Sequence, residues 1–162
     1  MSRTLLIDNA WRAGSGGATL PVINPAYGTT IQEIAAATPD DVNAAVSAAT
    51  RAFADWSQTS GRERAAVMHE AMRIFRERYL DEAARLLTQE SGKPLNDSMK
   101  EVKYSADVVE FYADESRRIT GTHFAGDMGS THSFVLKQPV GVVGAIVPFN
   151  FPVDLLAWKL GP

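Results

Sequence analysis

The sequence predicts an α/β fold that combines a helical layer, an antiparallel ribbon and the first strand of a parallel sheet. Three observations support this: apolar residues recur at helical spacing between residues 38 and 118, alternate over 133–138, and run without alternation over 140–147. The chain has 162 residues, 45% of them apolar, which is the size of one ordinary domain. We expect a meander with helices in 1–118, a ribbon in 119–139, and a strand followed by a helix in 140–162.

The first part of the chain is expected to form short antiparallel strands. Stretches rich in β-branched and apolar residues occupy 4–7, 19–23 and 30–35, and turn-forming residues separate them at 14–17 and 24–28. The glycine cluster at 14–17 precedes no helix, whereas phosphate-binding glycines open one. We therefore predict a meander here rather than a phosphate-binding loop.

Two helix starts follow, each with its own capping signal. Thr38 precedes Asp41 at the spacing of a capping box, and Pro39 suits the first helical position. Ser60 and Glu63 repeat that spacing at the start of a second helix. The first helix carries an apolar stripe that we expect to face a core, made of Val42, Val46, Ala49, Phe53 and Trp56.

Two further helices are expected before the ribbon. The third spans about 81–89 and ends at Gly92 and Pro94, because glycine favours a helix C-terminus and proline cannot continue the helix. The fourth is longer and runs to about Arg118. Its predicted buried stripe consists of Met99, Val102, Ala106, Val109 and Ala113.

The spacing of apolar residues changes from helical to alternating after the fourth helix. Over 133–138, Phe134 and Leu136 share one face, which suits an exposed antiparallel ribbon whose loop spans about 121–132. The run 140–147 is apolar on both faces, as is typical of a strand inside a parallel sheet. Such a strand needs neighbouring strands, and too few residues follow to supply them. We therefore expect the chain to be the front part of a longer protein.

Composition and spacing exclude several classes of site. The formal net charge is −3, which gives no basic surface for nucleic acid, and no apolar stretch reaches the ~20 residues of a membrane span. The chain contains no cysteine, so it offers no thiol nucleophile and no cysteine metal site. The three histidines are not clustered with carboxylates, and no metal site is predicted. Because no signal-peptide pattern is visible, we expect a cytoplasmic protein.

No motif in the sequence assigns a chemical role to the charged residues on the helices. Lys93 follows a glycine but precedes Pro94, whereas a phosphate-binding Walker loop needs a hydroxyl residue there. The carboxylates, including those of Glu90 and Glu101, fit a solvent-exposed face of mixed charge.

The Pro-Phe-Asn-Phe-Pro segment at 148–152 is the strongest candidate for a functional site. It follows the predicted strand and precedes a helix, and ligands of open α/β sheets bind at the carboxyl ends of parallel strands. The amide of Asn150, held between two prolines, can donate a hydrogen bond to a developing oxyanion. It can equally make a side-chain turn bond, as asparagine often does. The residues alone leave both interpretations open.

In addition, the sequence resembles the aldehyde dehydrogenase superfamily along its whole length, as the N-terminal portion of that fold. The order of the motifs carries the resemblance, because each motif alone is weakly specific. They are Trp11 after a strand, Val22-Ile23-Asn24-Pro25-Ala26-Tyr27-Gly28, Asp41 to Val46, Ala52-Phe53 with Trp56, Arg64, Glu90-Ser91-Gly92-Lys93-Pro94, Glu101-Val102, Pro139 to Val143, and the segment 148–152.

This resemblance implies the oxidation of an aldehyde to a carboxylic acid with NAD or NADP as cofactor. In the family, a cysteine thiolate forms a thiohemiacetal and then a thioester, hydride passes to the nicotinamide, and a glutamate-activated water releases the acid. Asn150 is similar to the asparagine that stabilises the oxyanion, and Lys159 to the lysine linked to proton relay. The residues similar to those lining the family's cofactor cleft are Ile146, Val147, Pro148, Phe149 and Asn150.

The resemblance also implies a Rossmann-like sheet in a cofactor-binding domain, a small aldehyde substrate, and a homodimer or homotetramer in the full-length protein. The ribbon at 119–139 is similar to the family's oligomerisation element. Phe149 replaces the commoner tryptophan, as in branches that act on small oxygenated or carboxylated aldehydes, semialdehydes among them. Since the family's cysteine and base glutamate follow the matched motifs, we expect these 162 residues alone to be inactive. The alternative is a non-catalytic fragment or interaction module that lends its ribbon to a partner.

Overall fold

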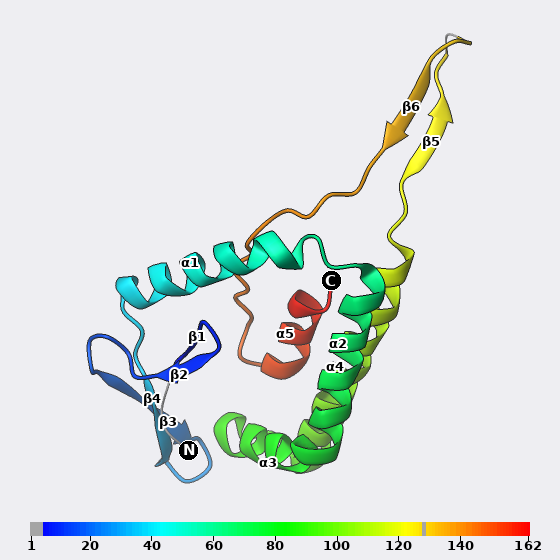
Figure 1. Ribbon diagram of the computed structural model, residues 1–162. Coiled ribbons are helices and arrows are strands. Elements are labelled where there is room, and N and C mark those ends of the chain that lie inside the picture. Colours follow the sequence, from blue (N-terminus) through cyan, green and yellow to red (C-terminus); the bar gives the residue numbers. More distant parts are fainter. Residues whose placement is uncertain (1–4, 128) are drawn as a thin grey trace.

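The computed structural model describes residues 5–127 and 129–162 and confirms the α/β class (Figure 1). Two hairpins come first, a layer of helices follows, and another hairpin precedes the last helix. Each hairpin is a separate two-stranded antiparallel sheet. The elements are β1 (Leu5–Ile7), β2 (Ala10–Arg12), β3 (Thr19–Asn24), β4 (Thr29–Ala35), α1 (Pro39–Trp56), α2 (Gly61–Arg78), α3 (Leu80–Ser91), α4 (Leu95–Glu115), η1 (Ser116–Arg118), β5 (Thr122–Ala125), β6 (His132–Val135) and α5 (Pro152–Leu160).

The N-terminal strands form two hairpins instead of the single meander that the sequence predicts. β1 pairs with β2 through Asp8 and Asn9, whose φ values of 55° and 58° are typical of a tight type I′ turn. β2 was not predicted, because its three residues are too few to show the alternation of apolar and polar residues that is typical of a strand. β3 pairs with β4, with a register shift between Val22 and Ile23. Thr4, in the first predicted strand, lies outside the described residues.

Capping boxes start α1 and α2 at the predicted residues. The Asp41 backbone N–H donates to Thr38 Oγ1 over 3.3 Å, and the Asp41 carboxylate accepts from the Thr38 N–H over 2.9 Å. The same carboxylate accepts from the backbone N–H of Ser15 at 3.0 Å, so it ties the preceding loop to α1. These N–H groups, that of Thr38 first, hold the pKa of Asp41 below its usual value. Ser60 and Glu63 form the second box.

The hydrophobic core lies between α3 and α4. Ala84, Leu87 and Val102 are buried there, and Val153 of α5 packs against them. α2 and α5 also pack along α4, so this helix is the centre of the helical layer (Figure 1). The predicted stripe on α4 is confirmed by its buried members, Val102, Ala106 and Ala113.

The apolar stripe predicted to bury α1 is exposed, and that prediction is wrong. Val42, Val46 and Trp56 are all exposed, and α1 packs mainly against β1. Figure 1 shows α1 crossing the end of the molecule away from α3. Helical periodicity indicates which face of a helix is apolar but not which element covers it, and no described element covers this face.

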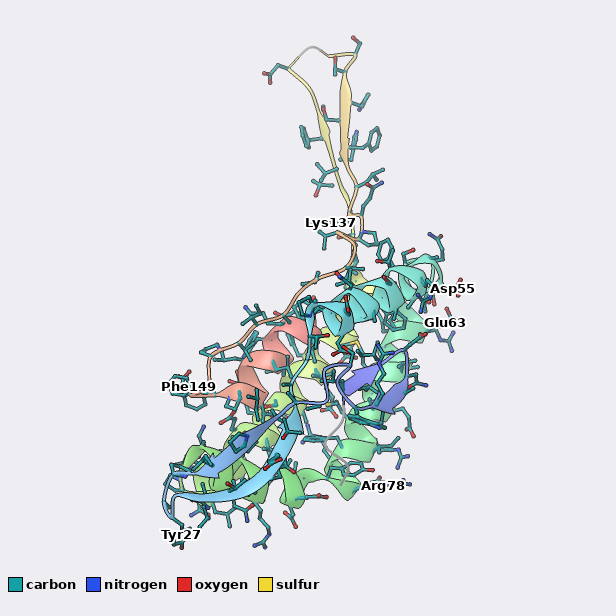
Figure 2. The ribbon with its side chains drawn as sticks, turned by 90° about the vertical axis from the view of Figure 1, so that its left-hand side faces the viewer. Tyr27, Asp55, Glu63, Arg78, Lys137 and Phe149 are labelled. Atoms are coloured by element: carbon teal, nitrogen blue, oxygen red, sulfur yellow. The ribbon has the colours of Figure 1, made fainter. Side chains whose placement is uncertain are left out.

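The ribbon projects from the body of the molecule, with Lys137 near its base (Figures 1 and 2). β5 pairs with β6, so four residues that the sequence assigns to the loop form a strand. Phe134 and Leu136 are exposed, as the sequence predicts. Met128, within the predicted loop, lies outside the described residues.

The apolar run 140–147 forms neither helix nor strand, which contradicts the prediction of a buried parallel strand. Val140 is 92% exposed and Ile146 is 94% exposed. A strand needs hydrogen bonds to a neighbouring strand, and no described segment pairs with this one.

Candidate active site

The segment 148–151 forms a turn that leads directly into α5. Pro152 occupies the first helical turn, where its fixed φ suits the helix. Asn150 is exposed, and its carboxamide has no hydrogen-bond partner among the described residues. The side-chain turn bond that the sequence allows for Asn150 is therefore not formed. Phe149 is 89% exposed and points outward at the edge of the molecule (Figure 2).

Glu101 of α4 caps the start of α5 from outside that helix. The N-cap residue is Phe151, whose side chain cannot accept a hydrogen bond. Glu101 Oε1 instead accepts from the backbone N–H groups of Val153 at 3.0 Å and Asp154 at 3.4 Å. A carboxylate here satisfies N–H groups that have no partner within the helix and meets the positive end of the helix dipole.

Lys93 connects Glu101 to the turn that carries Asn150. Its ammonium group forms an ion pair with Glu101 and donates to the backbone carbonyl of Asn150 over 2.8 Å. It also lies 4.2 Å from the centre of the Phe151 ring, within range of a cation–π interaction. The side chains of Lys93 and Glu101 are 15% and 1% exposed. This pair is largely withdrawn from water, although the sequence assigns both residues to no site.

The chain between α3 and α4 places Lys93 at this point. Gly92 ends α3 with a left-handed φ of 74°, as the sequence predicts. A Cβ atom on Gly92 would lie 2.9 Å from Cγ of Pro25, so the β3–β4 loop also requires glycine here. Pro94 is the N-cap residue of α4, which begins at Leu95. Lys93 therefore lies between a glycine in the left-handed conformation and a proline, whose φ is fixed.

A groove of about 480 Å³ lies beside the turn and is lined by α4, the start of α5, Lys93 and Asn150. Asp154 lines it as well, and its Oδ1 atom is buried without a hydrogen-bond partner among the described residues. Burial, and then the negative charge of Glu101, raise the pKa of Asp154. The groove therefore combines the unpartnered amide of Asn150 with groups that can donate and accept protons.

The remaining predicted site residues are not brought together with this amide. Ile146 and Val147 lie in the segment before the turn, which pairs with no described strand. Lys159 lies in the last turn of α5, about 10 Å along the helix axis from Pro152 at 1.5 Å per residue. It is exposed and has no ion pair with any described residue.

Two contributors to the turn are missing from the sequence prediction, namely Lys93 and Glu101. The prediction that Glu101 lies on a solvent-exposed face is wrong, because its side chain is buried. One signal was available in the sequence. A helix that begins at Pro152 after Phe151 has no capping side chain of its own, so its first N–H groups need an acceptor from elsewhere. The sequence could not show that the acceptor lies on α4.

The histidines among the described residues make only pairwise polar contacts. His69 contacts Asp114 over 3.0 Å, and His123 contacts His132 over 2.9 Å on the ribbon. No group of three or more metal-ligating side chains occurs within 5–127 and 129–162. None of the helices in the described part of the chain is long and apolar enough to cross a membrane.

Comparison with known proteins identifies the family. Residues 11–162 match the family model described as "Aldehyde dehydrogenase family". The chain belongs to this family. The match includes the 148–152 turn, Lys93 and Glu101, so the site described above lies within the part of the chain that defines membership.

Similar proteins include aldehyde dehydrogenases from bacteria and plants. The chain is 36% identical over 157 residues to succinate-semialdehyde dehydrogenase [NADP(+)] of Escherichia coli, covering 97% of this chain and 32% of that protein. It is 39% identical over 170 residues to betaine aldehyde dehydrogenase 1 of Oryza sativa subsp. japonica, covering 99% and 33%. The chain thus spans about a third of the length of these relatives.

Solved structures of this family share the fold of the chain. Succinate-semialdehyde dehydrogenase from Burkholderia pseudomallei superposes with a TM-score of 0.92 at 31% identity, covering 99% of this chain and 33% of that one. Betaine aldehyde dehydrogenase from Staphylococcus aureus, in complex with NAD+, gives a TM-score of 0.90 at 29% identity, covering 99% and 32%.

Proposed function

We propose that the chain is the N-terminal third of an NAD(P)-dependent aldehyde dehydrogenase in which Asn150 stabilises the oxyanion. The observation that supports this role is the unpartnered carboxamide of Asn150 on a turn held by Lys93 and Glu101. When a nucleophile adds to an aldehyde carbonyl, negative charge develops on the oxygen. A fixed N–H donor stabilises that charge more than it stabilises the neutral carbonyl, and so lowers the barrier.

The cofactor of the proposed enzyme is NAD or NADP, which accepts a hydride when bound. The residues present fit such a group because exposed apolar side chains precede the Asn150 amide along the chain. Ile146 and Phe149 are exposed, and Val147 and Pro148 connect them. In this proposal these apolar side chains would hold the cofactor, and Asn150 would supply a polar contact to it.

The substrate class that we propose is a small aldehyde with a polar or charged far end, a semialdehyde in the first instance. The relatives named above act on succinate semialdehyde or betaine aldehyde. The phenylalanine at position 149 fits the same class. In this proposal Lys159 takes part in proton relay, and its exposed ammonium group on α5 is compatible with that role.

We further propose that the β5–β6 ribbon contacts another subunit of a homodimer or homotetramer. Its strands pair only with each other among the described residues, and it projects from the body (Figure 1). Phe124, Phe134 and Leu136 are exposed along it. An exposed strand edge with apolar side chains is a surface that a second chain can cover.

A second candidate function is that of a non-catalytic module that lends this ribbon to a partner. The observation that favours it is the absence of cysteine from the 162 residues, because the family's nucleophile is a cysteine thiolate. The two candidates differ in whether the polypeptide made from the natural gene oxidises aldehydes.

An activity assay of the natural gene product tests the proposal. We expect reduction of NAD+ or NADP+ when succinate semialdehyde or betaine aldehyde is added, and no reduction with the matching alcohol or acid. Each cofactor is tested with each aldehyde, and the production of NADH or NADPH is followed by absorbance. A gene product that reduces neither cofactor with any of a panel of small aldehydes contradicts the proposed enzyme and favours the module.

A further inference from the structure

We propose that Lys93 and Glu101 are positioning residues that fix the direction of the Asn150 carboxamide. This inference rests on the proposed role of Asn150, but its structural part can be tested without it. Lys93 donates to the backbone carbonyl of Asn150, and Glu101 binds the first turn of the helix that follows. The pair thus holds the Asn150 turn at the asparagine carbonyl and at the first turn of α5.

Few other contacts hold the turn in place. The segment before it, 136–148, belongs to no sheet or helix. The residue after it, Phe151, supplies no side-chain cap to α5. Among the described residues, the hydrogen bonds that tie the turn to the helical layer are those of Lys93 and Glu101. Their loss would leave the packing of α5 on α4 as the remaining restraint.

Charge makes the two residues interdependent. Glu101 is a buried carboxylate, and Asp154 brings a second carboxyl group close enough for the charge of Glu101 to raise its pKa. The ammonium group of Lys93 is in contact with Glu101 and offsets this negative charge. Without Lys93, the buried charge of Glu101 would have no cation beside it and would repel the carboxyl group of Asp154, so its hold on the start of α5 would weaken.

Amide hydrogen exchange in this chain tests the structural part. The N–H groups of Val153 and Asp154 have their partner in Glu101, so their exchange rates report the contact directly. In Lys93→Met and in Glu101→Ala, we expect exchange at these two amides to accelerate about tenfold or more, because charge-assisted bonds are lost. Exchange at the buried Val102 amide in α4 reports global opening and is expected to accelerate by a clearly smaller factor, from the general destabilisation that follows the loss of a buried ion pair.

Kinetics of the natural gene product test the catalytic part. Both variants should lower kcat by on the order of 10–10²-fold, with KM for the aldehyde unchanged, because the oxyanion exists only after attack. Lys103→Met is the matched control. Lys103 also lies on α4, but it is exposed, does not line the groove and forms no ion pair with any described residue. We expect the control to match the unaltered protein in exchange and in kcat.

The outcomes separate this inference from the proposed function. Exchange at Val153 and Asp154 that matches the Lys103→Met control overturns it. Acceleration by the same factor at Val102 also overturns it, because the pair would then only stabilise the fold. The positioning role is wrong if kcat falls no further than in the control, or if KM rises while kcat stays unchanged. An unaltered gene product without activity contradicts the proposed function, while the exchange rates still decide whether the pair holds the turn.

Discussion

Replacing Asn150 with alanine in the natural gene product is expected to lower kcat for aldehyde oxidation by about 10²–10³-fold. The carboxamide has no partner among the described residues, so its removal leaves no buried polar group unsatisfied. The fold should therefore be unaffected, and the loss should appear in the chemical step. Steady-state kinetics with a saturating cofactor measure the effect, and thermal unfolding of the variant shows that the fold is intact.

Two further variants identify the group responsible. Asn150→Asp keeps the shape of the side chain but replaces the N–H donor with an acceptor oxygen, so it should be at least as damaging as Asn150→Ala. Asn96→Ala is the matched control, because Asn96 is also exposed and its carboxamide has no hydrogen bond to any described residue. A kcat for Asn150→Ala equal to that of the control would remove Asn150 from the mechanism.

Replacing Leu87 with alanine is expected to lower the free energy of unfolding by about 2–5 kcal/mol. Leu87 is 2% exposed and packs with Ala84 and Val102 at the contact between α3 and α4. The substitution removes apolar contacts and leaves a cavity that the helices can only partly close. Denaturant unfolding followed by circular dichroism measures the change.

The neighbouring residue provides the control for this prediction. Leu86 has the same side chain on the same helix but is 37% exposed. Leu86→Ala should therefore cost clearly less than Leu87→Ala, since less apolar surface returns to water. Equal effects of the two substitutions would mean that the core does not lie between α3 and α4.

Helix boundaries could be predicted from the sequence because their signals are local. Thr38 with Asp41, and Ser60 with Glu63, form their capping boxes within four residues of chain. Gly92 ends α3 through its own backbone conformation. The family resemblance likewise depended on the order of short motifs, and the match over residues 11–162 confirms it.

Features that depend on distant partners could not be predicted. The stripe on α1 and the run 140–147 have the composition of buried elements, yet both are exposed because no described element covers them. The Lys93–Glu101 contact was missed for a related reason. Lys93 and Glu101 are 8 residues apart, and they contact a turn and a helix start that lie 52 to 57 residues further along the chain. Spacing rules reach only a few residues along one helix.

The intact mass of the natural gene product tests the central proposal most directly. The 162 residues have a mass of 17.6 kDa and contain no cysteine. Because the chain covers 32% of the Escherichia coli relative, an aldehyde dehydrogenase that contains it should have a mass well above 17.6 kDa. We expect that result from mass spectrometry of the denatured protein. A mass equal to 17.6 kDa would contradict the proposed enzyme, since no cysteine nucleophile could then be present in the polypeptide.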